Sequence, residues 1–323
     1  MADLGPMPVS MSMGGYTDAN RAFLQAFLAR SVLTLETAKP VIAAISTVRD
    51  GREVQAQDIT VDDLNHYISA ANRKLSPLDL EIRSTFHQQT RERVYGLVNT
   101  TSDPLTQLAT TYTADEIIYV KKLLDAMFDG QNNKGRREAM CLSGIEAIQV
   151  GRAQNRRETQ DGNENATQPS AAGMLGARDA EAMLNKLLDE GWLEKSRLGF
   201  YSLSPRALME LKGWLVETYN EEDEDGQRRD KIKFCHACKE IITVGQRCPR
   251  RECSCRLHDI CTQNFFRMQR SQTCPICKTE WDGQHYVGEK AITTSESYQS
   301  GRRRSGHRPR VDPGAEHSGD GND

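Results

Sequence analysis

Eight side chains that can bind a metal ion lie close together in the last third of the sequence, grouped in four pairs. They are, in chain order, Cys235, Cys238, Cys248, Cys253, His258, Cys261, Cys274 and Cys277. Two cysteines separated by two residues place their thiolates on one side of a tight turn, but no segment this short supplies four ligands. Pairs that are distant in sequence must therefore converge, and eight ligands are enough for two tetrahedral zinc sites.

The same cysteines could instead form disulfides, since eight of the nine in the chain lie between Cys235 and Cys277. However, we expect no secretion signal, because the first residues include neither a basic stretch nor an apolar run. Dense CxxC pairs in such a chain are typical of metal ligands in a reducing compartment. Cys255 is a ninth candidate ligand, so the residues alone leave the fourth position open between Cys253 and Cys255, with Cys253 preferred.

A site with four protein ligands has no open coordination position, so we expect the metal to be structural and not catalytic. The segment is too short to bury a self-sufficient core. Zinc must therefore supply folding energy, about 10–16 kcal/mol apparent for each site. Occupied thiolates cannot act as nucleophiles, so any activity must come from binding and positioning other proteins.

The ligand order of four cysteines, one histidine and three cysteines fits two families of zinc modules, RING-like domains and PHD fingers. A PHD finger usually has an aromatic residue two positions before the seventh ligand, where this chain has Gln272. The last pair reads Cys-Pro-Ile-Cys over 274–277, a form typical of RING domains. Phe265 and Phe266 follow the sixth ligand, where RING domains build an apolar groove. The sequence favours the RING-like alternative.

The residues before this segment alternate between helical and strand periods, and one order of elements occurs twice. Apolar spacing predicts, in the first series, helices starting near residue 18, over 38–48 and over 60–75, and strands over 78–86 and 94–98. It predicts, in the second series, helices starting near residue 113, over 136–150 and over 177–190, a hairpin over 192–203 and a closing helix from residue 205. Three helices followed by a hairpin is the order of a winged-helix domain.

Composition divides the chain further. The predicted parts are a disordered N-terminus at 1–17, winged-helix domain A at 18–102, winged-helix domain B at 103–220 with a polar insertion at 151–172, an acidic linker at 221–231, a RING-like zinc domain at 232–285 and a disordered basic tail at 286–323.

No apolar run of about 18 residues occurs, which excludes a membrane-spanning helix. The net charge of −3 favours neither a dedicated nucleic-acid binder nor a membrane-surface protein.

The whole organisation resembles the non-SMC element one family, the RING-bearing subunit of the Smc five–six complex in DNA repair and recombination. The resemblance covers about residues 18–285, and its most specific pieces are the metal pattern and the stretch 256–261 running into 264–266. It implies an α+β multidomain protein, with tandem winged-helix domains followed by a small two-zinc variant RING module. The family spacing places the fourth ligand five positions before the histidine, which is Cys253.

The resemblance also implies a nuclear RING-type E3 ubiquitin transferase that binds a MAGE-type partner and a ubiquitin-conjugating enzyme. Such ligases hold the thioester in a reactive geometry and often place a cationic linchpin just after the eighth ligand. Lys278 stands there, although lysine cannot donate bidentately as arginine does. His236 and Ala237 occupy the positions between the first two ligands, where Ile or Leu usually touches the conjugating enzyme. We therefore expect weak activity without a partner. The groove residues expected in this chain are Ile241, Ile242 and Pro275.

A second hypothesis keeps the zinc module without the activity, as a non-catalytic scaffold or a PHD-like chromatin-binding subunit. A winged helix that reads DNA should present a basic third helix. The helix 177–190 carries two basic and four acidic side chains, and the helix 61–75 carries two of each. Both domains are therefore expected to dock proteins, and any DNA contact to be indirect. The arginines of the tail, 302–304, 308 and 310, are a candidate nucleic-acid or nuclear-import segment; the alternative is a solubilising tail.

Overall fold

The computed structural model describes residues 15–100, 111–130, 137–151, 175–222 and 228–305. We call residues 18–99 the first unit. Its elements are α1 (Asp18–Leu28), β1 (Val32–Thr34), α2 (Leu35–Asp50), α3 (Val61–Leu75), β2 (Leu80–Phe86) and β3 (Arg93–Asn99). The strands form an antiparallel sheet in the order β1-β3-β2. The three predicted helices and the hairpin are all present, and β1 adds a strand that periodicity did not predict.

Helix capping and one apolar face explain why α3 forms where it does. The Thr60 hydroxyl accepts a hydrogen bond from the Asp63 backbone N–H at 3.2 Å, and the Asp63 carboxylate accepts one from the Thr60 N–H at 2.9 Å. This capping box satisfies two backbone donors at the start of the helix. Leu64 and Tyr67 of α3 are then buried in one cluster with Phe23 of α1 and Ile82 of β2. The first unit therefore has a core of its own.

We call residues 112–219 the second unit. Its elements are α5 (Ala114–Phe128), β4 (Leu142–Ser143), α6 (Gly144–Val150), α7 (Ala177–Asp189), β5 (Leu193–Lys195), β6 (Phe200–Leu203), α8 (Pro205–Glu210) and α9 (Lys212–Tyr219). The sheet order is β4-β6-β5. Apart from residue 151, the predicted polar insertion at 151–172 lies outside the described residues.

The second helix of this unit is shorter than the sequence predicts. It begins at Gly144 and not near residue 136, because Ser143 and Glu146 form a capping box that fixes its start. The residues before it are extended or turned, with positive φ values of 54° at Glu138 and 49° at Met140. Amphipathic spacing did not reveal this break, because Ala139, Cys141 and Leu142 are buried in the extended segment as helical residues would be.

Residues 232–287 form the cysteine-rich part. Its elements, with the short hairpin that precedes them, are β7 (Asn220–Glu222), β8 (Arg228–Asp230), β9 (Gly245–Arg247), β10 (Arg256–Leu257), α10 (Asp259–Gln269) and β11 (Tyr286–Val287). The sheet order is β10-β9-β11. In the predicted acidic linker, Glu221 and Glu222 pair with Arg229 and Arg228 across β7 and β8, so these ends of the linker form a strand ladder.

The predicted disordered tail differs from the structure over residues 286–305. These residues form β11 and two helices, α11 (Lys290–Thr293) and α12 (Glu296–Ser305). Val287 is fully buried, and Ile292 and Tyr298 pack against Phe200 of β6. Widely spaced apolar residues are thus sufficient to dock this segment although its overall composition is polar. The rest of the tail lies outside the described residues.

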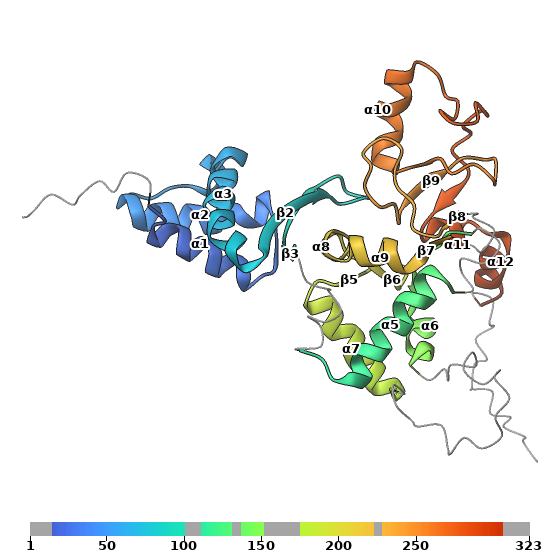
Figure 1. The fold of residues 1–323 in the computed structure, drawn as a ribbon, viewed down its shortest axis with the longest axis horizontal. Coiled ribbons are helices and arrows are strands. Elements are labelled where there is room, and N and C mark those ends of the chain that lie inside the picture. The colour runs from blue at the N-terminus through green and yellow to red at the C-terminus, as the bar shows by residue number, and fades with distance from the viewer. Residues whose placement is uncertain (1–14, 101–110, 131–136, 152–174, 223–227, 306–323) are drawn as a thin grey trace, which may run out of the picture.

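The three parts contact one another (Figure 1). The first unit packs its strand β3 against α8 of the second unit, and its β2–β3 hairpin extends to the cysteine-rich part (Figure 1). The cysteine-rich part shares a core with the second unit, because Ile232, Ile241, Ile242 and Val287 belong to the buried cluster of that unit. No described helix has both the length and the apolar character needed to cross a bilayer.

Candidate metal centre

Among the described residues, two groups of four side chains bring their ligand atoms within 4.8 Å of one another. The first cluster consists of Cys235, Cys238, His258 and Cys261, and the second cluster of Cys248, Cys253, Cys274 and Cys277. Each cluster therefore joins two sequence pairs, and the pairs alternate between the clusters along the chain. Pairs that are distant in sequence thus converge, as predicted, and they do so by interleaving.

Two similar turns present the first and the last pair. In each turn the first cysteine exchanges backbone hydrogen bonds with the residues that follow: Cys235 with Lys239 and Glu240, and Cys274 with Lys278 and Thr279. Lys239 and Lys278 have φ values of 64° and 59°, the left-handed conformation that closes each turn. Both thiolates of a CxxC pair can therefore face the same metal.

The donor sets and spacing of both clusters fit zinc. The Sγ atoms of Cys248 and Cys277 are 3.4 Å apart, and those of Cys253 and Cys274 are 3.6 Å apart. A Zn–S bond of about 2.3 Å in a tetrahedron gives sulfur separations of about 3.8 Å. Three cysteines with one histidine, and four cysteines, are both common sets for structural zinc. The two clusters thus fit two zinc ions, as predicted.

The histidine of the first cluster has a defined orientation. His258 is buried, its Nδ1 lies 3.2 Å from the Cys238 Sγ, and its Nε2 lies 3.2 Å from the Ile241 carbonyl oxygen. A carbonyl only accepts, so Nε2 carries the proton and the Nδ1 lone pair faces the sulfurs. This hydrogen bond from the outer ring nitrogen is the arrangement that fixes a metal-binding imidazole.

Two cysteines lie outside the clusters. Cys255 is buried, and its carbonyl accepts hydrogen bonds from the Cys248 N–H and from Arg256. Burial raises the pKa of the Cys255 thiol, and burial likewise raises the pKa of Cys141 in the second unit. Neither is therefore an activated nucleophile. The structure brings Cys253, not Cys255, into the second cluster.

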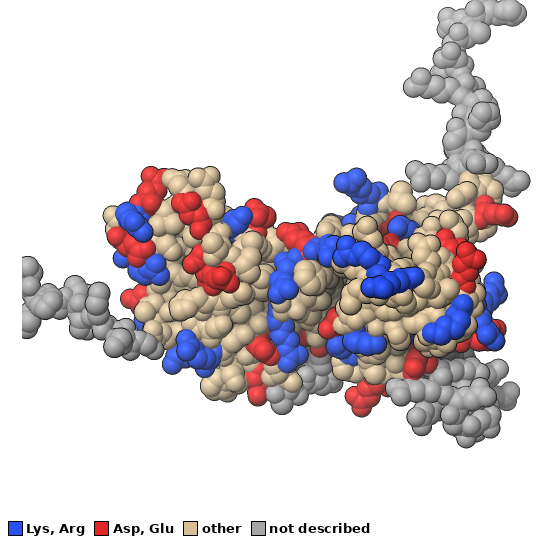
Figure 2. All heavy atoms as spheres, turned by 90° about the horizontal axis from the view of Figure 1, so that it is seen from above, with Lys and Arg blue, Asp and Glu red and all other residues tan. Residues whose placement is uncertain are grey.

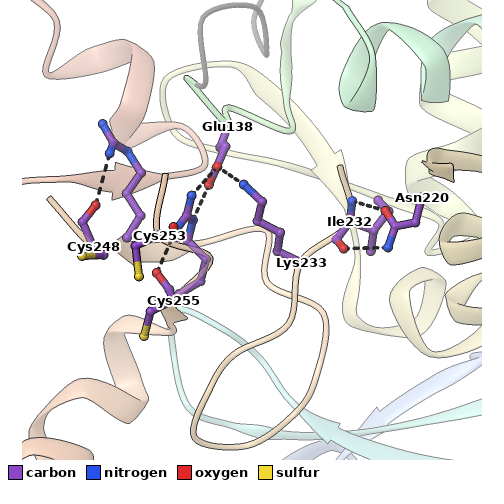
Figure 3. Close-up of polar contacts among 9 residues, drawn as sticks. Glu138, Asn220, Ile232, Lys233, Cys248, Cys253 and Cys255 are labelled. Atoms are coloured by element: carbon purple, nitrogen blue, oxygen red, sulfur yellow. Dashed lines mark hydrogen bonds and ion pairs between the residues drawn. The ribbon is translucent and has the colours of Figure 1, made fainter. Parts of the chain in front are cut away.

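A buried ion pair joins the metal centre to the second unit. Glu138, from the irregular segment before β4, accepts two hydrogen bonds of 2.6 Å from Arg256 and a further bond from Lys233 (Figure 3). Arg256 also donates to the carbonyls of Cys253 and Cys255, at 2.7 and 2.8 Å. Burial raises the pKa of the Glu138 carboxyl, but the hydrogen bonds and charges of the two cations outweigh it and hold the pKa below its ordinary value. No sequence pattern indicates this pair, because Glu138 stands in an irregular segment 97 residues before the first ligand.

The predicted groove residues have different environments. Ile241 and Ile242 are 2% and 0% exposed and belong to the core shared with the second unit, so neither presents a surface to a partner. Pro275 is half-buried, whereas Ile276 beside it is 50% exposed and Lys278 is exposed. Phe265 and Phe266 are half-buried; their rings stack edgewise on His236 and at a tilt on Trp281, respectively. Ile276 was not among the predicted groove residues, although it lies within the CPxC turn at 274–277.

Comparison with known proteins agrees with this geometry. Residues 20–211 match the family described as the Nse1 non-SMC component of the SMC5-6 complex, and residues 235–277, from the first ligand to the last, match a RING-like domain. The human non-structural maintenance of chromosomes element 1 homolog is 24% identical over 269 residues, which are 83% of this chain and 86% of that protein.

Two further matches also cover most of this chain. The Schizosaccharomyces pombe non-structural maintenance of chromosomes element 1 is 22% identical over 237 residues, 73% of this chain and 84% of that protein. A solved Nse1-Nse3-Nse4 complex contains a chain with the same fold, at a TM-score of 0.61 and 20% identity, covering 84% of this chain and 99% of that one. Because the family match spans more than half of the sequence and agrees with the two interleaved clusters, this chain belongs to the Nse1 family.

Proposed function

We propose that this chain is a RING-type E3 ubiquitin transferase subunit of an SMC5-6 complex, acting in the nucleus in DNA repair and recombination. The observation that carries the proposal is the RING-like domain with its two interleaved four-ligand clusters. Bound zinc supplies rigidity there, because each cluster has four protein ligands. The chemistry of transfer then depends on how the protein surface holds a ubiquitin-charged conjugating enzyme, which is catalysis by orientation.

The contact surface for the conjugating enzyme is proposed at the second metal-binding turn. Ile276 is 50% exposed between two ligands of the second cluster, beside Pro275. This replaces the buried Ile241 and Ile242 as the apolar contact. The Lys278 ammonium is exposed and donates to the Pro275 carbonyl at 3.1 Å, which leaves two of its three N–H groups available to act as a linchpin on ubiquitin. Because a lysine donates as a point charge and not bidentately as arginine does, we expect slow transfer by the chain alone.

The first and second units are proposed to be winged-helix domains, at 18–102 and 103–220, that dock on a MAGE-type Nse3 partner. Each unit contains helices followed by a hairpin in a three-stranded antiparallel sheet, and the matched structure is a complex that includes Nse3. Figure 2 looks onto the RING-like domain and the adjoining side of the first unit, and basic and acidic side chains are interspersed over both. This mixed surface supports protein docking with indirect DNA contact.

The test is single-turnover discharge of ubiquitin from a charged conjugating enzyme, by the full chain with and without its MAGE-type partner. The expected result is slow discharge by the chain alone and at least tenfold faster discharge by the complex, a difference of about 1.4 kcal/mol in barrier. Lys278→Ala should slow the assisted reaction while both zinc ions stay bound. Equal rates with and without the partner would disprove the partner dependence.

A non-catalytic scaffold is the second candidate. It is favoured by one observation: the apolar residues nearest the first metal-binding turn, Ile241 and Ile242, are committed to the core, and that turn itself contains only His236 and Ala237 between its ligands. If a broad panel of conjugating enzymes shows no discharge above background while the complex with Nse3 still forms, the scaffold function stands and the transferase is rejected.

A further inference from the structure

The β2–β3 hairpin of the first unit makes a specific polar contact with the cysteine-rich part. The Gln88 side-chain amide donates to the Ile241 carbonyl at 3.0 Å, and its oxygen accepts from the backbone N–H groups of Thr243 and Val244 at 3.0 and 2.9 Å. One side chain thus satisfies three backbone groups of the segment 241–244. Asn220 binds the backbone of Ile232 in a similar way (Figure 3).

The Ile241 carbonyl has a second donor, and this donor is a metal ligand. His258 Nε2 donates to the same oxygen at 3.2 Å, while its Nδ1 faces the sulfurs of the first cluster. Ile241, Thr243 and His258 are all at least 95% buried. Water has little access to such a place and cannot replace a lost partner, so a backbone N–H or carbonyl left without a hydrogen bond there lowers the stability of the fold. The position of the Ile241 carbonyl therefore affects the orientation of the His258 ring.

The hairpin also covers one side of the first cluster. A cavity of about 80 Å³ lies between the hairpin, α8 and the cluster, and its lining includes Gln88, Phe86, Leu208, Cys238, His258 and Cys261. The same hairpin is tied to the second unit, because His87 Nε2 lies 3.1 Å from a Glu194 carboxylate oxygen of β5. The hairpin is thus held in place from two directions.

We propose that Gln88 is a positioning residue for the first zinc site. By holding the Ile241 carbonyl where the His258 ring donates, it makes zinc retention at that site depend on the docked hairpin of the first unit, some 150 residues earlier in the chain. Loss of an outer-shell partner of a zinc-bound histidine typically weakens metal binding about 10- to 100-fold. Gln88 binds the carbonyl and not the histidine itself, so it is one hydrogen bond further from the metal. We therefore expect a loss of zinc affinity near the lower end of this range.

The test compares three variants of the full chain. Gln88→Met keeps the length of the side chain and removes all of its hydrogen bonds to the segment 241–244, including the one from the Thr243 hydroxyl. Gln88→Glu keeps an acceptor for Thr243 and Val244 but cannot donate to Ile241. Gln89→Met is the matched control, since Gln89 is the exposed neighbour in the same turn. The readouts are the rate of zinc release to a chelator and the cadmium-113 spectrum of the cadmium-loaded protein, in which three-cysteine–one-histidine and four-cysteine sites give separate signals.

The expected result for Gln88→Met and Gln88→Glu is about tenfold faster release of one zinc ion, a displaced cadmium signal for the histidine-containing site, and an unchanged second site. Gln89→Met should match the unaltered chain. Equal acceleration at both sites would show general loosening and overturn the proposal, as would no difference from the control. A Gln88→Glu protein that behaves like the unaltered chain would also overturn it, because the donor bond to Ile241 would then be dispensable.

Discussion

Replacing Glu138 with alanine should detach the RING-like domain from the second unit. The substitution leaves Arg256, whose side chain is 2% exposed, without its carboxylate, while Lys233 has a 22% exposed side chain and can turn to solvent. Removing one partner of a buried ion pair costs about 3–5 kcal/mol. Arg256 keeps its hydrogen bonds to the carbonyls of Cys253 and Cys255, so we expect about 3 kcal/mol.

Amide hydrogen exchange is the assay, because the chain has several units and a single unfolding midpoint would mix them. Loss of about 3 kcal/mol should reduce protection of the strands β9 and β10 about 100-fold, since 1.4 kcal/mol is a factor of ten. Glu240→Ala is the matched control. Its exposed pair with Lys212 also joins the second unit to the RING-like domain, but an exposed pair contributes at most about 1 kcal/mol.

A double variant separates charge from packing. Glu138→Ala with Arg256→Met removes both charges, and replacing a buried pair by apolar side chains is often close to neutral. The double variant should therefore recover part of the lost protection, and not all of it, because Arg256→Met also removes the donor to the Cys253 carbonyl. A Glu138→Ala effect no larger than that of Glu240→Ala, or a double variant less stable than the single one, would refute the view that an uncompensated buried arginine causes the loss.

Three further predictions follow from the metal centre and the hairpin. Cys255→Ser should retain two zinc ions per chain and Cys253→Ser only one, measured by metal analysis. The reverse result would make Cys255, and not Cys253, the zinc ligand. Cys274→Ser should lower hydrogen-exchange protection in the RING-like domain and also in the second unit, because Ile241 and Val287 of the cysteine-rich part belong to the core of the second unit. The protection of the first unit should not change. The hydrogen bond to Glu194 raises the pKa of His87 more than partial burial lowers it, and the charge of Glu92 adds to the rise. The stability that His87 contributes is therefore present below about pH 6.5 and is lost as the pH rises through the folded pKa. The stability difference between the unaltered chain and His87→Gln should accordingly be larger at pH 6 than at pH 8.5, and an equal difference at both would contradict this.

The parts of the fold that depend on local pattern could be predicted from the sequence. The capping box of Thr60 and the apolar stripe of α3 are local features, and both occur in the structure. The CxxC turns likewise depend on neighbouring residues, so the spacing alone indicated two four-ligand clusters. The resemblance to the family rested on the order of the elements together with the metal pattern, and the family and domain matches agree with it.

The features that sequence reasoning missed are contacts between distant residues. Glu138 lies in an irregular segment and Gln88 in a hairpin turn, and no local pattern distinguishes these polar residues from solvated positions. Ile241 and Ile242 follow the first turn at a place where a surface groove was a reasonable expectation, yet the second unit covers them. Tyr298 docks a tail segment whose composition is polar. In each case the partner lies on another element, which only the assembled chain reveals.

The most direct test of the proposed transferase is ubiquitin discharge by two matched surface variants of the full chain, assayed with the MAGE-type partner. Ile276 and Met268 are both exposed apolar residues of the RING-like domain, at 50% and 83%, but only Ile276 lies in a metal-binding turn. Ile276→Ala should slow discharge about tenfold or more, a loss of about 1.4 kcal/mol of transition-state stabilisation, with two zinc ions retained. Met268→Ala should leave the rate unchanged. Equal rates for both variants and the unaltered chain would contradict the account of how this domain holds the conjugating enzyme.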